Sequence, residues 1–150
     1  KEVGSGFSNI DAQLALDHGI KIIDIAGSGG TSWSRIEHHR QEDDHDLGVV
    51  FQDWGIPTPV SLKLLSPYKD ELSVIASGGI RTGIDMVKSV VLGASLAGMA
   101  SPFLKPAMES PEKVIEVIER IKREFITAMF LMGVSSVDEL YLNDELIIDF

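Results

Sequence analysis

Short apolar segments alternate with amphipathic ones along this chain, and glycines cluster where the apolar segments end. Residues 21–26 (KIIDIA), 73–76 (SVIA) and 95–100 (SLAGMA) are short and rich in β-branched or small side chains, as buried strands are. Segments with helical periodicity lie between and after them. Repeated strand-then-helix units predict a parallel sheet with right-handed crossovers, either doubly wound or closed into a barrel.

The length of the chain bounds how much of such a fold it can hold. If Lys1 to Val3 is the end of a further strand, four strands are present in 150 residues. A complete (β/α)8 TIM barrel takes about 250 residues and eight strands. The chain also opens on Lys1 rather than on Met. We therefore expect residues 1–150 to form a single domain that is a fragment of a longer protein.

The predicted helices follow from capping signals and apolar periodicity. They cover residues 11–18, 32–40, 58–66, 82–93 and 110–132. Ser8 with Asp11, and Thr82 with Asp85, have capping-box spacing, and Thr58 before Pro59 is typical of an N-cap. The acidic segment 41–47 is predicted to be a surface loop.

The last and longest predicted helix has one apolar face. That face consists of Val114, Ile118, Ile121, Phe125, Ala128 and Met132. The stripe favours a helix packed on a sheet over a coiled coil, because it spans too few heptads for a long supercoil.

Three glycine-containing loops follow predicted strands: residues 26–31 (AGSGGT), 77–81 (SGGIR) and 98–101 (GMAS). Glycine lets backbone N–H groups approach an anion, and a following helix N-terminus adds a favourable dipole. Barrels commonly bind phosphate between the loops after the seventh and eighth strands. The last two loops are joined by a helix of suitable length, so they predict a phosphate site, in which Arg81 could take part. The alternative is a surface arginine paired with acids.

Composition excludes several classes of function. The formal net charge of -10 argues against partners such as nucleic acid or an anionic membrane. The absence of cysteine excludes a disulfide framework and a thiolate metal site, and it favours a cytoplasmic location. No segment approaches the roughly 20 apolar residues of a membrane span.

Five segments in succession resemble one family. They are KEVGSGFS at the start, DIAGSGGTSWSRIE, DWGIPT, ASGGIRTGID and LAGMASPFL. Together they resemble the type 2, FMN-dependent isopentenyl-diphosphate isomerases, over nearly all of the chain. The resemblance implies the C-terminal half of a TIM barrel, about four βα units with a long C-terminal helix. It also implies interconversion of isopentenyl and dimethylallyl diphosphate, a small-molecule diphosphate substrate, with reduced FMN moving the protons.

The same resemblance implies roles for individual residues. Lys1 would lie beside the flavin and stabilise its anionic reduced form by charge. Thr31 would form a hydrogen bond with FMN, and Ala26 would contact FMN through its backbone. The phosphate cradle would consist of Gly78, Gly79, Ile80, Arg81, Ala100 and Ser101. Trp33 and Glu37 would be catalytic. Trp33 would stabilise positive charge on the isoprenoid. Glu37 would relay protons or orient the network of groups around the substrate's diphosphate.

NADPH as reductant and Mg²⁺ are also implied, with the metal ligand in the missing N-terminal half. His38, His39 and His45 lie near Glu42, Asp43 and Asp44, but adjacent histidines point in different directions, so we expect no metal there. A homo-oligomer is expected for the full-length protein. Alone, the fragment would expose sheet edges and apolar surface, so it should aggregate or self-associate.

Two other functions remain open. One is an FMN-dependent oxidoreductase of the α-hydroxyacid oxidase type, whose His-Gly-Arg cluster is replaced here by residues 27–33 (GSGGTSW). The other is a half-barrel that binds phosphate or FMN without catalysis.

Overall fold

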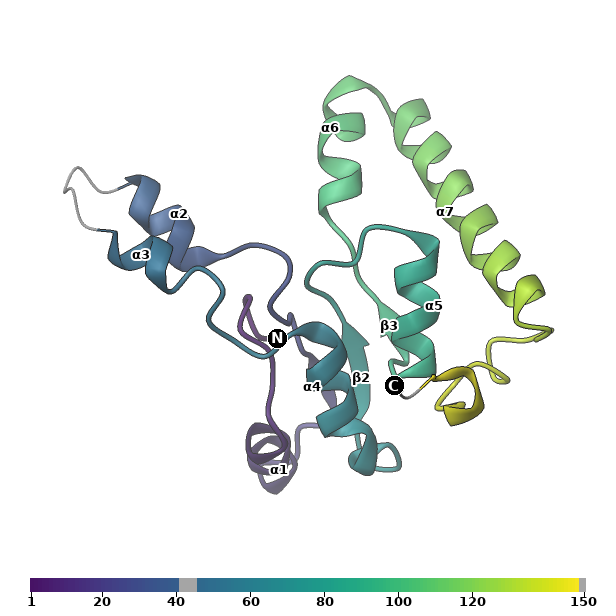
Figure 1. Cartoon of the computed structure of the whole chain (residues 1–150), viewed down its shortest axis with the longest axis horizontal. Coiled ribbons are helices and arrows are strands. Elements are labelled where there is room, and N and C mark those ends of the chain that lie inside the picture. The colour runs from purple at the N-terminus through teal and green to yellow at the C-terminus, as the bar shows by residue number, and fades with distance from the viewer. Residues whose placement is uncertain (41–45, 149–150) are drawn as a thin grey trace.

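A three-stranded parallel sheet forms the centre of the chain (Figure 1). This computed structural model describes residues 1–40 and 46–148. The strands are β1 (Ile22–Asp24), β2 (Ser73–Ala76) and β3 (Leu96–Ala97), in the order β1-β2-β3. Ile23 pairs with Val74, and Ile75 with Leu96. The predicted parallel sheet is confirmed, although each strand is shorter than its apolar segment.

The prediction of a fourth strand at Lys1 to Val3 is wrong. Within the described residues, the one backbone hydrogen bond from this segment to β1 is that of the Glu2 N–H, which donates to Asp24 O at 3.0 Å. The chain then turns at Gly4 and Gly6, which have φ of +146° and +77°. The Glu2 carboxylate accepts the N–H groups of Gly4, Ser5 and Gly6, with the last at 3.1 Å. Because this turn closes on Glu2, the backbone does not continue alongside β1.

Helices occupy most of the remaining chain. They are α1 (Asn9–Asp17), α2 (Trp33–Arg40), α3 (Leu47–Val50), α4 (Thr58–Leu65), α5 (Gly83–Val91), α6 (Ser101–Glu109) and α7 (Pro111–Leu131), with 3-10 turns at Ser66–Tyr68 and Asp144–Leu146. Both predicted capping boxes are present, Ser8 with Asp11 and Thr82 with Asp85. None of the described helices is long and apolar enough to cross a membrane.

Two helices were not predicted. Helix α6 has Pro102 in its first turn, where the missing N–H costs nothing, but it also carries Pro106 in its interior. That second proline concealed the helix from a periodicity argument. The short helix α3 begins at Leu47, at the end of the segment predicted as a loop. Residues 41–45 of that loop lie outside the described residues.

The sheet and helices α1 and α4 share one apolar core. Ala12 of α1 and Leu62 and Leu65 of α4 pack with Ile23 and Val74, on one face of the sheet. On the opposite face, Ile22 and Leu96 are 67% and 63% exposed. A parallel sheet is normally covered on both faces, so this chain alone leaves apolar strand residues uncovered.

Helix α7 packs on α5, not on the sheet as predicted. Val87, Val90 and Val91 of α5 form a second cluster, against which Phe125 and Ala128 of α7 pack. In Figure 1, α5 lies between the sheet and α7, so α5 takes the place that was expected for the sheet.

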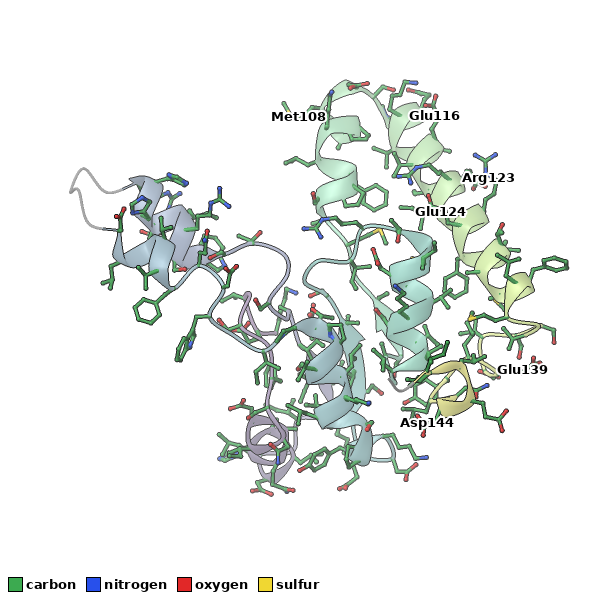
Figure 2. The ribbon with its side chains drawn as sticks, viewed as in Figure 1. Met108, Glu116, Arg123, Glu124, Glu139 and Asp144 are labelled. Atoms are coloured by element: carbon green, nitrogen blue, oxygen red, sulfur yellow. The ribbon has the colours of Figure 1, made fainter. Side chains whose placement is uncertain are left out.

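A polar contact fixes the same helix pair. The Glu124 carboxylate of α7, labelled in Figure 2, accepts the Gly83 N–H at the start of α5 at 2.8 Å. Arg120 donates to Glu124 at 2.6 Å. Helix α7 therefore contributes one acceptor to the N-terminus of α5.

Candidate functional site

One cavity of about 570 Å³ opens at the C-terminal ends of the three strands. Its lining comes from four segments of the chain, which are residues 1–4, 24–33, 77–81 and 98–101. All nine residues that the sequence predicts to bind the cofactor line it: Lys1, Ala26, Thr31, Gly78, Gly79, Ile80, Arg81, Ala100 and Ser101. The volume falls within the range of about 300–1,000 Å³ that is typical of small-molecule and cofactor sites.

Two glycine loops approach each other so closely in this cavity that they exclude a β-carbon. A β-carbon on Gly78, where φ is +93°, would overlap the carbonyl oxygen of Gly27 and lie 2.7 Å from its nitrogen. One on Gly79 would lie 2.8 Å from Gly29 O. The glycines are therefore needed for the close packing of the two loops, in addition to any role they have in binding a ligand.

Thr58 holds the same region together. Its hydroxyl donates to Ser77 O at 3.0 Å and to Gly78 O at 2.7 Å. The prediction that Thr58 caps α4 is wrong, because its hydroxyl fixes the glycine loop and the N-cap position belongs to Pro57.

Backbone donors are available on the wall formed by the second and third loops. Within residues 1–40 and 46–148, the N–H groups of Gly79, Ile80 and Ala100 donate to no protein acceptor. Helix α6 begins at Ser101 with no side-chain cap. The α5 N-terminus is already closed by Thr82 and Asp85. Of the two helix starts that follow these loops, only that of α6 lacks a side-chain cap, and within the described residues its Ser101 N–H donates to no protein acceptor.

Arg81 links two of the loops. Its guanidinium donates to Gly29 O at 3.0 Å and to Gly79 O at 3.2 Å. Its backbone N–H donates to Asp85. The side chain thus bonds carbonyl oxygens rather than the acids of the alternative interpretation, and its positive charge stays on the cavity wall.

Lys1, Asp24 and Ser77 form a charged cluster in the lining of the same cavity. Lys1 Nζ lies 2.5 Å from Asp24 Oδ2 and 3.0 Å from Ser77 Oγ. Burial of the Asp24 carboxyl opposes ionisation, but hydrogen bonds from Lys1, Ser77 and the Ala26 N–H outweigh it and lower the pKa of Asp24. The Asp24 carboxyl in contact with Lys1 is therefore ionised, and the two side chains form an ion pair.

Ala26 has an unusual backbone conformation for a residue with a side chain. Its φ is +34°, in the left-handed region, and it is only 6% exposed. Its N–H donates to Asp24 Oδ1 at 3.1 Å. Left-handed backbone outside glycine is uncommon and gathers at functional sites.

Trp33 stands between this cavity and a second one. The second cavity, of about 730 Å³, is also lined by Arg35, Phe51, Asp53 and Trp54. The Trp33 indole is half exposed, and its Nε1 donates to Val3 O at 2.8 Å. This bond connects the start of α2 to the segment that carries Lys1.

Glu37 is separate from both cavities. It lies on α2, where its carboxylate pairs with Arg40 at 3.3 Å, and it lines neither cavity. The structure thus brings Trp33 to the predicted cofactor residues but does not bring Glu37 there.

Sequence reasoning missed Asp24 and Ser77. An acid inside the apolar segment KIIDIA was the available signal, because a charge at a strand's C-terminal end is costly unless it has a partner. Ser77 carried no such signal. Its hydroxyl donates to Asp24 Oδ1 at 2.5 Å, a contact that only the pairing of β1 and β2 creates.

The histidine segment extends beyond what the structure describes. His38 and His39 lie on α2 with ring centroids 5.3 Å apart. His45, Glu42, Asp43 and Asp44 fall outside the described residues. Among residues 1–40 and 46–148, no three His, Asp or Glu side chains are grouped so that they could hold a metal ion.

Comparison with known proteins places this cavity in a family. Residues 7–148 match the FMN-dependent dehydrogenase family. Curated proteins named isopentenyl-diphosphate delta-isomerase from Hydrogenovibrio crunogenus, Paracoccus zeaxanthinifaciens and Methanothrix thermoacetophila are 55%, 51% and 45% identical to the chain. They match 99%, 98% and 93% of it, whereas the chain spans 44%, 44% and 40% of their length.

Solved structures agree on the fold. A mutant flavocytochrome b2 with pyruvate bound is 25% identical with a TM-score of 0.63, over 93% of this chain and 32% of that one. Another flavocytochrome b2 mutant is 24% identical with a TM-score of 0.67, over 98% and 37%. These neighbours imply a TIM-barrel-type fold, and the partial parallel sheet with its helices is consistent with part of such a barrel. The chain belongs to the family of FMN-dependent dehydrogenases and, within it, resembles the proteins named isopentenyl-diphosphate delta-isomerase.

Proposed function

We propose that the chain is the FMN-binding, C-terminal half of a TIM-barrel enzyme that interconverts isopentenyl diphosphate and dimethylallyl diphosphate. One observation carries the proposal: nine residues chosen from a sequence resemblance, spread from Lys1 to Ser101, line a single cavity. Identity of 43–55% to proteins named for that isomerase supports the choice of reaction. Activity and substrate belong to the longer protein, since the chain spans less than half of those relatives.

The volume and the donors of the cavity support FMN as its ligand. The N–H groups of Gly79, Ile80 and Ala100, with the uncapped start of α6, would hold the phosphate, since within residues 1–40 and 46–148 they donate to no protein acceptor. Arg81 would add a positive charge beside it. Thr31 would form a hydrogen bond with the flavin through its hydroxyl, and Ala26 would contribute a backbone contact just after β1.

The chemistry would divide between the cofactor and the protein. Bound reduced FMN would supply the groups that remove a proton from one carbon of the isoprenoid and add one to another. Lys1 would place positive charge at the flavin, where it favours a negative ligand. Trp33, between the two cavities, would turn its ring toward developing positive charge on the substrate. For Glu37, which pairs with Arg40 and lines neither cavity, we retain as a proposal the role of relaying protons or orienting the network on the diphosphate side.

The remaining components of the proposal lie outside this chain. We propose NADPH as the reductant of FMN and Mg²⁺ as the ion of the diphosphate, with the Mg²⁺ ligand in the part of the protein that precedes residue 1. We also propose a homo-oligomer and a cytoplasmic location, the first on the family resemblance and the second on the absence of cysteine from the sequence.

The test is isomerase activity of the full-length protein with FMN, NADPH and Mg²⁺. Wild type should convert isopentenyl diphosphate, and Lys1→Ala should lose at least about tenfold in kcat, as expected when a charge beside the reacting centre is removed. Lys63→Ala, an exposed lysine on α4, is the matched control. Turnover of a 2-hydroxy acid instead would identify an oxidoreductase, and bound FMN without any turnover would identify a binding module.

A further inference from the structure

The ammonium of Lys1 is not free in the cavity. Nζ donates to Asp24 Oδ2 and to Ser77 Oγ, so two of its three protons already have acceptors. The Lys1 side chain is 58% exposed, whereas Asp24 is only 17% exposed. The lysine is therefore the more exposed partner of the pair, and the aspartate is the more buried one.

Three donors fix Asp24. Oδ2 accepts from Lys1, and Oδ1 accepts from Ser77 Oγ at 2.5 Å and from the Ala26 N–H at 3.1 Å. Asp24 is the last residue of β1, and Ser77 directly follows β2, so the pairing of these two strands brings them together. The carboxylate is thus held by the sheet itself and by the left-handed turn at Ala26.

All four residues line the cavity that would hold FMN. A lysine with a charged carboxylate in contact presents a weaker and shorter-ranged positive field than a lysine alone, because the two charges largely cancel at a distance. The affinity of the cavity for a ligand whose charge changes on reduction would depend on the strength of this field.

We propose that Asp24, with Ser77, is a positioning residue that holds the Lys1 ammonium on the cavity wall, and that FMN experiences the two as an ion pair rather than as a bare cation. This inference rests on the proposed FMN-binding function. It assigns Asp24 the role of limiting how strongly the protein prefers reduced over oxidised FMN.

The test measures the dissociation constants of oxidised and of reduced FMN, without oxygen, for the full-length protein. Asp24→Asn keeps the shape and an acceptor for Lys1 but removes the negative charge. It should shift the ratio of the two constants toward reduced FMN by on the order of tenfold, equivalent to a rise of about 30 mV in the two-electron potential. Asp17→Asn, the same charge change on the exposed surface of α1, should leave the ratio as in wild type.

Variants of Lys1 distinguish an ion pair of Lys1 and Asp24 from a Lys1 cation that acts alone. Lys1→Met leaves Asp24 unpaired and should shift the ratio about tenfold toward oxidised FMN. Lys1→Met combined with Asp24→Asn removes both charges, so it should return the ratio to within about threefold of wild type. If Lys1 acted alone, the double variant would match Lys1→Met, and the proposal would be overturned.

Ser77→Ala separates the charge of the pair from its positioning. It keeps both charges but removes one of the two hydrogen bonds that hold the Lys1 ammonium, so it should shift the ratio by less than Asp24→Asn does. A shift as large as that of Lys1→Met would show that the lysine depends on Ser77 and would overturn the role of Asp24. If wild type bound no FMN, the proposed function would fail together with this inference. FMN binding with a ratio unaffected by Asp24→Asn would overturn the inference alone.

Discussion

Gly78→Ala tests whether the glycine loops of the cavity are packed backbone against backbone. A methyl group there meets two costs. The φ of +93° places a β-carbon in an unfavourable conformation, worth about 1–2 kcal/mol. The methyl would also overlap Gly27 O and lie 2.7 Å from Gly27 N, and forced overpacking of this kind costs about 1–3 kcal/mol.

The neighbours of Gly78 cannot move away freely. Thr58 donates to both Ser77 O and Gly78 O, and the Gly27 N–H donates to Ser77 O at 2.9 Å. We therefore expect Gly78→Ala to lower the free energy of unfolding by about 2–5 kcal/mol, which moves the urea midpoint of the FMN-free, full-length protein by roughly 1–2 M.

Gly19→Ala is the control for the backbone term alone. Gly19 has φ of +76°, yet a β-carbon on it would meet nothing within 4 Å. Its substitution should cost only about 1–2 kcal/mol. Equal losses at Gly78 and Gly19 would refute the argument, because they would mean that the close approach of the two loops contributes nothing.

Three further predictions concern stability. Ser61 is fully buried and bonds both Phe7 O and Phe7 N, so Ser61→Ala should lower the urea midpoint by the equivalent of about 1–3 kcal/mol; an unchanged midpoint would contradict it. Partial burial of Asp85 opposes its ionisation, but bonds from the Arg81 and Thr82 N–H groups and the Thr82 hydroxyl lower its pKa below the usual 3.8. The ionised Asp85 carboxylate therefore stabilises the folded protein above pH 3.8, and this stabilisation is lost as pH falls through the folded pKa. In acid unfolding titrations, the stability difference between wild type and Asp85→Asn should shrink only below pH 3.8. Ala26→Gly should be neutral or stabilising by up to about 1 kcal/mol in urea unfolding, because relief of left-handed strain exceeds the entropy cost of glycine; a loss would show that the strain is absent.

The sheet and the cofactor cavity were predictable because their signals are local. A β-branched run such as KIIDIA specifies a strand, and glycines placed directly after strands specify where parallel strands leave room for a ligand. The nine cofactor residues were implied by the family resemblance, and all of them, among them Lys1 and Arg81, line one cavity at these strand ends. Whether each of them binds FMN stays a prediction.

The misses come from contacts between segments distant in sequence. Thr58 has a hydroxyl suited to an N-cap, but a better pair of acceptors, Ser77 O and Gly78 O, reaches it only after the strands align. Helix α7 has an apolar stripe suited to any apolar surface, and the stripe alone does not say whether that surface is a sheet or a helix. At Lys1 to Val3 a turn held by Glu2 overrode an extended pattern.

The two bonds from Arg81 to Gly29 and Gly79 bear on how the cavity responds to heat. They tie together loops from two different strands before any ligand arrives, so the loss of conformational freedom is incurred during folding rather than during binding. A cleft organised in advance in this way leaves little further ordering for its ligand to impose. Binding there should carry a small entropic penalty, so the affinity of the cleft for a phosphate-bearing ligand should weaken on warming mainly through enthalpy rather than through melting of its walls.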